Sequence, residues 1–302
     1  MYHKPVLLEE SLERMGLKPG GIYVDCTFGG GGHSRELLSR LDADGRLFAF
    51  DQDPDAWENA LDDPRFCLIR MNFRHIKKGL RLHGVQKVDG ILADLGVSSH
   101  QFDAAQRGFS LRFEGPLDMR MNPLSGVTAA DWLEACDEKE LRWVLKTYGE
   151  VPNAGRLAAA LRKRLDQGKL ESTAELSQFL EGFAPAQKIH SYKAQVFQAL
   201  RIVVNQEMEA LRELLADSIE LLSLQGRLVI ISYHSLEDRM VKQFMREGWA
   251  DGDVERDERG RRHFRLRPMH RKPLSPDSAQ IEENTRARSA KLRAAERLEE
   301  WV

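Results

Sequence analysis

The stretch from Ile22 to Ser34, I-Y-V-D-C-T-F-G-G-G-G-H-S, constrains the fold more than any other part of this chain. It opens as an apolar strand and passes through four consecutive glycines, and a helical apolar pattern follows. Glycine adopts positive φ and has no Cβ to obstruct a ligand. A helix N-terminus presents unpaired N–H groups. The stretch therefore predicts a strand, a glycine turn and a helix that together form a ligand site.

A second strand is predicted at Arg46–Phe50, and it ends in Asp51. An acid at the end of the second strand, about 20 residues past the glycines, is placed to accept hydrogen bonds from ribose hydroxyls. The alternative is a tight turn followed by a surface acid. The spacing favours a cofactor that contains adenosine.

The glycine pattern distinguishes between two such cofactors. In the dinucleotide fingerprint G-x-G-x-x-G/A, the third glycine would fall on Ser34, which disfavours a pyrophosphate. A strand that ends in D-x-T-x-G-x-G-G is closer to the S-adenosylmethionine site of class I methyltransferases. We then expect Asp25 near the amino-acid end of the cofactor. The glycines expected beneath it are Gly29, Gly31 and Gly32.

Strands and helices alternate through the first part of the chain, which predicts an α/β, doubly wound (Rossmann-like) parallel sheet. Further strands are expected at Phe66–Arg70, Val88–Leu95 and Gly226–Ser232. Ligands bind such sheets at the carboxyl ends of the strands. The residues expected at that edge are Asp25, Asp51, Phe73 and Asp94.

An inserted domain is predicted because far more residues separate Asp94 from the next strand than the dozen or so that a crossover needs. We expect a methyltransferase core at residues 1–103 and 206–302, and a helical substrate-binding domain at 104–205. Its expected helices are Ala130–Tyr148, Ala154–Gln167 and Thr173–Phe183, the last capped by Ser172 or Thr173. A long amphipathic run follows at Lys193–Leu222, and its second half is expected to be the crossover helix that returns to the sheet.

Composition sets weaker limits. The net charge of −2 over 302 residues gives no overall attraction to nucleic acid, so any basic surface must be local. Three scattered cysteines suggest neither a disulfide framework nor a zinc site, and we expect no metal. The N-terminus has no long apolar run. These features favour a cytoplasmic protein with no membrane contact.

Two segments at strand ends are candidates for catalysis. In D-L-G-V-S-S, the Asp94 carboxylate is placed to accept a hydrogen bond from a target amine, and Ser98 and Ser99 are placed to hold a base. A helix cap and ordinary turn serines are the alternatives. In S-Y-H-S-L-E-D-R, His234 is expected beside the Asp94 loop, either taking part directly or as a structural residue. Ser235 and Asp238 suggest a capping box.

The predicted insert begins with residues suited to RNA. Arg107, Arg112 and Arg120 are placed to meet phosphates, and Phe109 and Trp143 are candidates to stack on a base, although core packing is favoured for Trp143. Residues 256–297 hold 13 Lys or Arg against 6 Asp or Glu. This excess indicates either a solvated rim or a phosphate-binding surface. Residues 251–262 are expected to form a loop.

These motifs together resemble one family, the bacterial 16S ribosomal RNA cytosine-N4 methyltransferases of the RsmH/MraW type. The resemblance covers nearly the whole chain, and its most specific motifs are D-G-I-L-A-D-L-G-V-S-S-H-Q and G-P-L-D-M-R-M. It implies methylation of a cytidine in the decoding region of the small ribosomal subunit. The positions that match the family's cofactor residues are Gly31, Gly32, His33, Asp51, Phe73, Asp94 and Gln101.

The expected partner is therefore 16S rRNA or the small ribosomal subunit, and a homodimer is compatible with the sequence. Two other functions compete with this one. The missing third glycine argues against a nicotinamide-dependent oxidoreductase. The intact Asp94 and glycines argue against a ribosome-assembly factor of the same fold without catalysis.

Overall fold

The computed structural model describes residues 5–247 and 264–298. The chain divides into two compact units, Met1–Gly96 with Met208–Val302, and Val97–Glu207. The predicted loop at residues 251–262 lies outside the described residues.

The first unit is built on one seven-stranded sheet with the strand order β3-β2-β1-β4-β5-β7-β6. Strands β1 to β5 run parallel, and β7 is antiparallel to both β5 and β6. The strands are β1 Ile22–Asp25, β2 Arg46–Phe50, β3 Phe66–Ile69, β4 Val88–Asp94, β5 Leu222–Ser232, β6 Leu266–Pro268 and β7 Lys291–Arg297. The predicted α/β fold of the class I methyltransferase type is confirmed.

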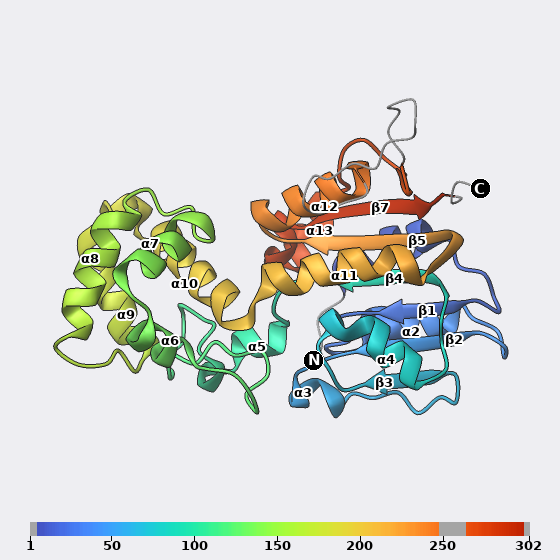
Figure 1. Cartoon of the computed structure of the whole chain (residues 1–302), viewed down its shortest axis with the longest axis horizontal. Helices are drawn as coiled ribbons and strands as arrows, with labels where there is room; N and C mark the ends of the chain where they lie inside the picture. Colours follow the sequence, from blue (N-terminus) through green and yellow to red (C-terminus); the bar gives the residue numbers. More distant parts are fainter. Residues whose placement is uncertain (1–4, 248–263, 299–302) are drawn as a thin grey trace. The chain divides into compact units, whose positions relative to one another are not determined.

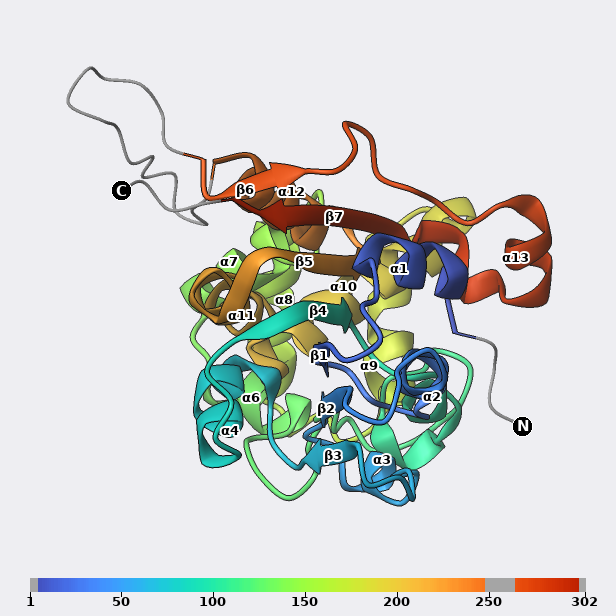
Figure 2. The same ribbon diagram turned by 90° about the vertical axis from the view of Figure 1, so that its right-hand side faces the viewer.

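Helices cover both faces of this sheet (Figures 1 and 2). Apolar side chains of α4, α11 and α12 pack on one face with Phe48 and Ile230. Those of α1 and α2 pack on the other face with Leu47 and Ile231. The helical elements of this unit are α1 Leu8–Met15, α2 Gly32–Ser39, α3 Pro54–Trp57, η1 Phe73–His75, α4 Ile76–Leu82, α11 Glu207–Leu221, α12 Ser235–Glu247, α13 Ser278–Glu283 and η5 Thr285–Ser289.

The second unit is mostly helical, apart from an irregular stretch at residues 108–128. Its elements are α5 Ser99–Asp103, η2 Ala105–Arg107, α6 Ala129–Ala135, α7 Glu138–Thr147, α8 Ala154–Leu165, α9 Thr173–Leu180, η3 Glu181–Phe183, η4 Ala186–Lys188 and α10 Ile189–Asn205. Ser172 caps α9 in a capping box with Glu175, as one of the two predicted caps. No described helix of either unit is long and apolar enough to span a bilayer.

Two long helices expected from the sequence are each broken in two. Ala130–Tyr148 is interrupted because Cys136 is extended and Asp137 caps a new helix, α7, by accepting a hydrogen bond from the Glu140 N–H. Lys193–Leu222 is interrupted at Gln206, whose φ of 49° ends α10 in the left-handed conformation. The apolar periodicity continues across both breaks, so periodicity alone did not reveal them.

Candidate active site

The glycine turn joins β1 to α2 at the carboxyl edge of the sheet. Gly29 and Gly31 have φ of 50° and 74°, which explains glycine at both positions. Gly32 is explained differently, because a Cβ there would collide with the ring of Pro5. Gly31 is the N-cap of α2 and offers no side-chain cap, so the first N–H groups of that helix have no side-chain acceptor from it.

Asp51 follows β2 and is held against this turn. Its Oδ2 accepts from the Gly29 N–H at 2.8 Å, and its Oδ1 accepts from the Asp53 N–H at 2.8 Å. Burial raises the pKa of Asp51 to about 6, although both hydrogen bonds act in the opposite direction. The indole N–H of Trp57 donates to the Asp51 carbonyl at 3.0 Å. The acid is therefore fixed beside the glycines, as its spacing predicts.

Asp25 ends β1 and is 1% exposed. Its Oδ1 accepts from the Thr27 N–H at 3.0 Å, and its Oδ2 accepts from the Ser34 hydroxyl at 2.6 Å. These bonds tie the end of β1 to the first turn of α2. The structure thus gives Asp25 a part in holding the turn, and its contact with a cofactor stays a prediction.

Asp94 ends β4 and is held from three sides. Its backbone N–H donates to Thr27 Oγ1 at 2.7 Å, and its Oδ1 accepts from the Tyr233 hydroxyl at 2.7 Å. Its Oδ2 lies 4.0 Å from Nδ1 of His33. Burial raises the pKa of Asp94 to about 6, against the opposing effects of His33 and the Tyr233 hydrogen bond.

His33 lies in the first turn of α2 and is 6% exposed. Its Nε2 is 3.2 Å from the Val6 carbonyl, which can only accept, so Nε2 carries a proton. Nδ1 is left to face Asp94. Phe73 opens η1 after β3 and packs partly buried against the sheet. The described structure therefore places Asp25, Asp51, Asp94, His33 and the glycines at the carboxyl edge of the sheet. Phe73 follows β3, which ends at the same edge.

His234 follows β5, but the predicted cap is one residue out of place. The Glu237 N–H donates to His234 Nδ1 at 3.4 Å, and Glu237 Oε2 accepts from the His234 N–H at 3.3 Å. The capping pair is therefore His234 with Glu237, not Ser235 with Asp238. Asp238 is instead bound by Arg293 at 2.7 Å. These contacts give His234 a structural role, and its direct participation stays a prediction.

Within the second unit, Ser98 and Gln101 form a capping box at the start of α5. Ser98 Oγ accepts from the Gln101 N–H at 3.2 Å, and Gln101 Oε1 accepts from the Ser98 N–H at 2.9 Å. Ser99 is the first residue of that helix. Gln101 is 5% exposed. The catalytic role of Ser98, the base contact of Ser99 and the cofactor contact of Gln101 remain predictions.

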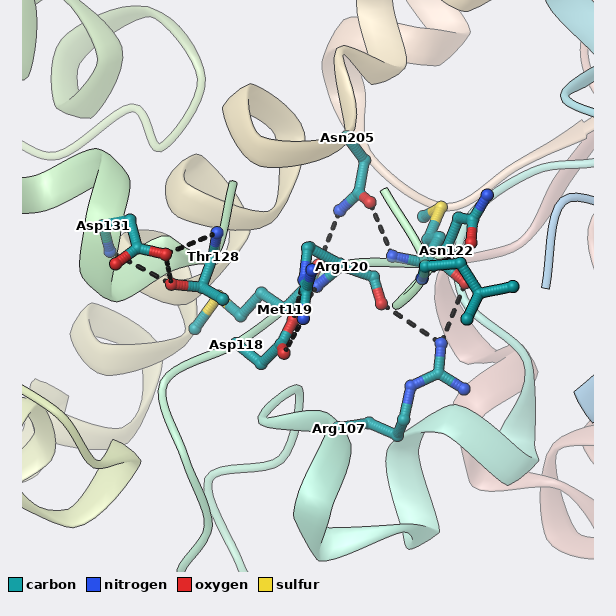
Figure 3. Close-up of polar contacts among 10 residues, drawn as sticks. Arg107, Asp118, Met119, Arg120, Asn122, Thr128, Asp131 and Asn205 are labelled. Carbon is teal, nitrogen blue, oxygen red and sulfur yellow. Dashed lines mark hydrogen bonds and ion pairs between the residues drawn. The ribbon is translucent and has the colours of Figure 1, made fainter. Parts of the chain in front are cut away.

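The predicted arginines of the insert differ in their surroundings, and Figure 3 shows two of them, Arg107 and Arg120. Arg107 is 6% exposed and donates to the carbonyls of Arg120 and Met121 at 3.1 and 2.8 Å. The guanidinium of Arg120 forms a two-pronged pair with Asp118, at 2.8 and 2.7 Å. Both side chains therefore hold the G-P-L-D-M-R-M segment. The side chain of Arg112 is exposed, which leaves it the best placed of the three to meet a phosphate.

The two aromatic candidates exchange their expected roles. Phe109 is 5% exposed and packs edge-on to Phe102, with ring centroids 6.5 Å apart. Trp143 is 52% exposed and contacts Tyr148 edge-on, with centroids 5.1 Å apart. Core packing was thus the wrong expectation for Trp143. Its exposed indole stays a candidate to stack on a base.

Comparison with known proteins decides what this site belongs to. The sequence matches the MraW methylase family over residues 1–298. The chain belongs to this family. It is 54% identical over 299 residues to the ribosomal RNA small subunit methyltransferase H of Cytophaga hutchinsonii, with 98% of this chain and all of that protein covered. The same protein of Flavobacterium psychrophilum is 52% identical over 291 residues, with 96% and 100% covered.

A solved rRNA methylase from Streptococcus thermophilus is similar at 13% identity and a TM-score of 0.43, with 99% of each chain covered. The family assignment rests on the sequence matches. As a member of the MraW methylase family, the chain is a methyltransferase that uses S-adenosylmethionine.

The residues at the sheet edge fit this cofactor. Asp51 and Asp94 are carboxylates with raised pKa values, and within residues 5–247 and 264–298 neither pairs with a Lys or Arg. Such groups gain from a ligand that brings hydroxyl donors and positive charge. S-adenosylmethionine brings both, in its ribose and in its sulfonium and ammonium groups.

Three polar residues of this MraW methylase site were missed from the sequence. The Ser34 hydroxyl donates to the Asp25 carboxylate, and Thr27 Oγ1 accepts from the Asp94 N–H. The Tyr233 hydroxyl donates to the Asp94 carboxylate. Thr27 lies within the glycine motif, and Tyr233 lies beside His234. Both were visible, but only the hydrogen bonds show what they hold.

Proposed function

We propose that this MraW methylase transfers a methyl group to the exocyclic N4 amine of a cytidine in the 16S rRNA of the small ribosomal subunit. The name of the relatives, ribosomal RNA small subunit methyltransferase H, supports the substrate. The observation that carries the chemistry is the Asp94 carboxylate, fixed at the carboxyl edge of the sheet by Tyr233 at 2.7 Å. It is a hydrogen-bond acceptor held in one orientation where a substrate amine is expected.

Asp51 and the glycine turn are assigned to cofactor binding. Each Asp51 oxygen accepts one backbone hydrogen bond, so each keeps acceptor capacity for a ribose hydroxyl. Gly29, Gly31 and Gly32 bring the backbone close without side chains, and Phe73 offers an apolar surface at the same edge. The cofactor supplies a methyl group already activated on a sulfonium sulfur.

Asp94 is assigned to the target amine. The cytosine N4 amine is a poor nucleophile, because its lone pair is delocalised into the ring. An acceptor for one amine hydrogen favours the pyramidal nitrogen that can attack. Orientation of this kind can supply up to about 7–11 kcal/mol of the barrier. The amine becomes strongly acidic once methylated, so the protein needs no strong base. Ser98 is the proposed second acceptor, and His234 is proposed to help hold the base.

The cytidine must leave its stack to reach this edge, which costs a few kcal/mol. The second unit is proposed to supply RNA contacts. Its exposed candidates are Arg112 for contact with a phosphate and Trp143 for stacking on a base. Arg107 and Arg120 instead hold the shape of the G-P-L-D-M-R-M segment.

A deletion strain tests the function. Small-subunit rRNA from the strain is digested, and the fragments are mapped by mass. The proposal requires loss of one methyl group from a cytidine N4 and its return when the wild-type gene is restored. Restoration with Asp94→Ala should not return it. An unchanged methylation pattern would contradict the proposal, and a methyl group restored by Asp94→Ala would contradict the role of Asp94.

A further inference from the structure

Tyr233 connects two parts of the methyltransferase unit that the sequence separates widely. It follows the last residue of β5, and its hydroxyl donates to Asp94 Oδ1 at the end of the neighbouring strand β4, at 2.7 Å. Its ring packs partly buried against the core on the α1 and α2 side of the sheet. Its own N–H donates to Glu237 Oε2 at 2.9 Å. Both the backbone and the ring of Tyr233 are therefore held in place.

The consequence is a fixed Asp94 carboxylate. The backbone of Asp94 is anchored to Thr27, Oδ1 is bound by Tyr233, and Oδ2 faces His33 at 4.0 Å. Without the tyrosine hydroxyl, the carboxylate would be free to rotate about its terminal torsion, which is a broad and soft one. The hydrogen bond from the tyrosine hydroxyl occupies one lone pair of Oδ1 and fixes the orientation of the carboxylate. The remaining lone pairs of the carboxylate then point in fixed directions.

We propose that Tyr233 is a positioning residue for methyl transfer, which orients the Asp94 carboxylate toward the target amine and keeps it charged. This inference rests on the proposed function, because it takes Asp94 as the acceptor for that amine. Tyr233 itself contacts neither the amine nor the methyl group. Its effect passes through the hydrogen bond to Oδ1.

The charge state of Asp94 gives this role a measurable sign. Burial raises the pKa of Asp94 to about 6, and the Tyr233 hydrogen bond opposes that rise. Burial and the Asp94 charge raise the pKa of Tyr233 well above its ordinary value, so the hydroxyl keeps its proton and donates at neutral pH. The other groups that act on Asp94 are His33 of α2, Asp25 of β1 and Glu237 of α12. Removing the hydroxyl alone should raise the Asp94 pKa further.

Tyr233→Phe tests the proposal, because phenylalanine keeps the ring and its packing. The matched control is Tyr23→Phe. Tyr23 is a fully buried tyrosine of the same unit, and its hydroxyl accepts from the Lys18 N–H at 2.6 Å, near the start of β1. The single-turnover methylation rate is measured from about pH 5 to 9 at saturating S-adenosylmethionine, on small subunits from the deletion strain. S-adenosylmethionine affinity is measured by calorimetry.

For Tyr233→Phe we expect a rate about tenfold lower at neutral pH, an acidic limb of the pH–rate profile moved to higher pH, and cofactor affinity within about threefold of wild type. Tyr23→Phe should move neither the limb nor the rate. A Tyr233→Phe rate within about twofold of wild type, or a lower rate with the limb unmoved, would overturn the positioning role. Asp94→Ala separates the two claims. If that variant keeps the full rate, the proposed function of Asp94 fails; if it is inactive while Tyr233→Phe is normal, only the role of Tyr233 fails.

Discussion

The Asp51 carboxylate at the end of β2 accepts a 2.8 Å hydrogen bond from the N–H of Gly29, in the turn after β1. The acid and the glycine turn are therefore one assembly, held together before any ligand binds. Preorganisation of this kind lowers the entropy lost on binding. Asp51 therefore fixes the turn, and we propose that it also meets the ribose of the cofactor.

Replacing Asp51 should weaken the cofactor site. A charge-assisted hydrogen bond contributes roughly 1.5–3 kcal/mol, so Asp51→Ala is expected to lower S-adenosylmethionine affinity by about one to two orders of magnitude. Calorimetry measures it. Asp44→Ala, at an exposed acid before β2, is the control and should bind normally. Equal affinity of Asp51→Ala and wild type would remove Asp51 from the site.

The raised pKa of Asp94 predicts how stability depends on pH. Its folded pKa of about 6 lies above the ordinary value of 3.8, so the folded state binds more protons between these values. The contribution of Asp94 to the free energy of unfolding is then full below about pH 4 and is lost as pH rises through about 6. Above pH 6 the cofactor-free protein keeps a charged, partly buried carboxylate.

Asp94→Asn should therefore stabilise the cofactor-free protein at pH 7.5, because it removes the charge. The amide oxygen of asparagine can still accept the hydrogen bond from Tyr233. The gain over wild type should fall away as pH is lowered to about 4. Denaturant unfolding of both proteins at several pH values measures it. A gain that is constant with pH, or a loss at pH 7.5, would show that Asp94 is not held with a raised pKa.

Sequence patterns predicted the sheet well, because strands β1 to β4 are apolar runs that end in acids or turns. The predicted bounds of β2 agree with the structure at both ends, and those of β3 and β4 differ by one residue. The apolar pattern did not predict the helix ends that depend on the backbone conformation of a single residue. The left-handed Gln206, at φ 49°, ends α10 within an unbroken apolar stripe, and the extended backbone of Cys136 ends α6.

The placement of Asp51 and Asp94 at the edge of the sheet was predictable, because an acid there coincides with the end of an apolar strand. It was not predictable where a residue acts through a partner far along the chain. Arg107 reads as a phosphate ligand in the sequence, but the structure buries it against the carbonyls of Arg120 and Met121. Tyr233 reads as a strand end, and only the hydrogen bond to Asp94, 139 positions away, gives it a role.

Asn205 should be critical for the second unit. Its Oδ1 accepts from the Met121 N–H at 2.7 Å, and its Nδ2 donates to the carbonyls of Met119 and Arg201 at 2.7 and 2.9 Å (Figure 3). Met119 is fully buried and has a φ of 61°. Asn205→Ala removes the partner of the Met121 N–H and of the Met119 carbonyl, at a cost of about 1–3 kcal/mol.

Denaturant unfolding of the full chain measures this cost. Asn122→Ala is the matched control, because Asn122 makes a surface hydrogen bond to the Leu124 N–H at 3.0 Å. It should change stability by less than about 0.5 kcal/mol. Equal stabilities of the two variants would contradict the role assigned to Asn205.

Arg112 should contribute to RNA binding through charge. If it meets one phosphate, Arg112→Ala weakens binding to the small subunit and lowers the slope of log affinity against log salt by about 1. Filter binding at several salt concentrations gives the slope. Lys139→Ala, at another exposed cation of the second unit, is the control. An Arg112→Ala slope equal to that of wild type would place this residue outside the RNA interface.

Single-turnover methylation by Asp94→Ala is the most direct test of the account. The rate is measured on small subunits from the deletion strain. S-adenosylmethionine is kept at a saturating concentration, so that weaker cofactor binding does not lower the measured rate. We predict a folded protein that has lost most of its turnover. A rate within about threefold of wild type would mean that Asp94 contributes less than about 1 kcal/mol to the barrier, and would contradict its role as the acceptor for the target amine.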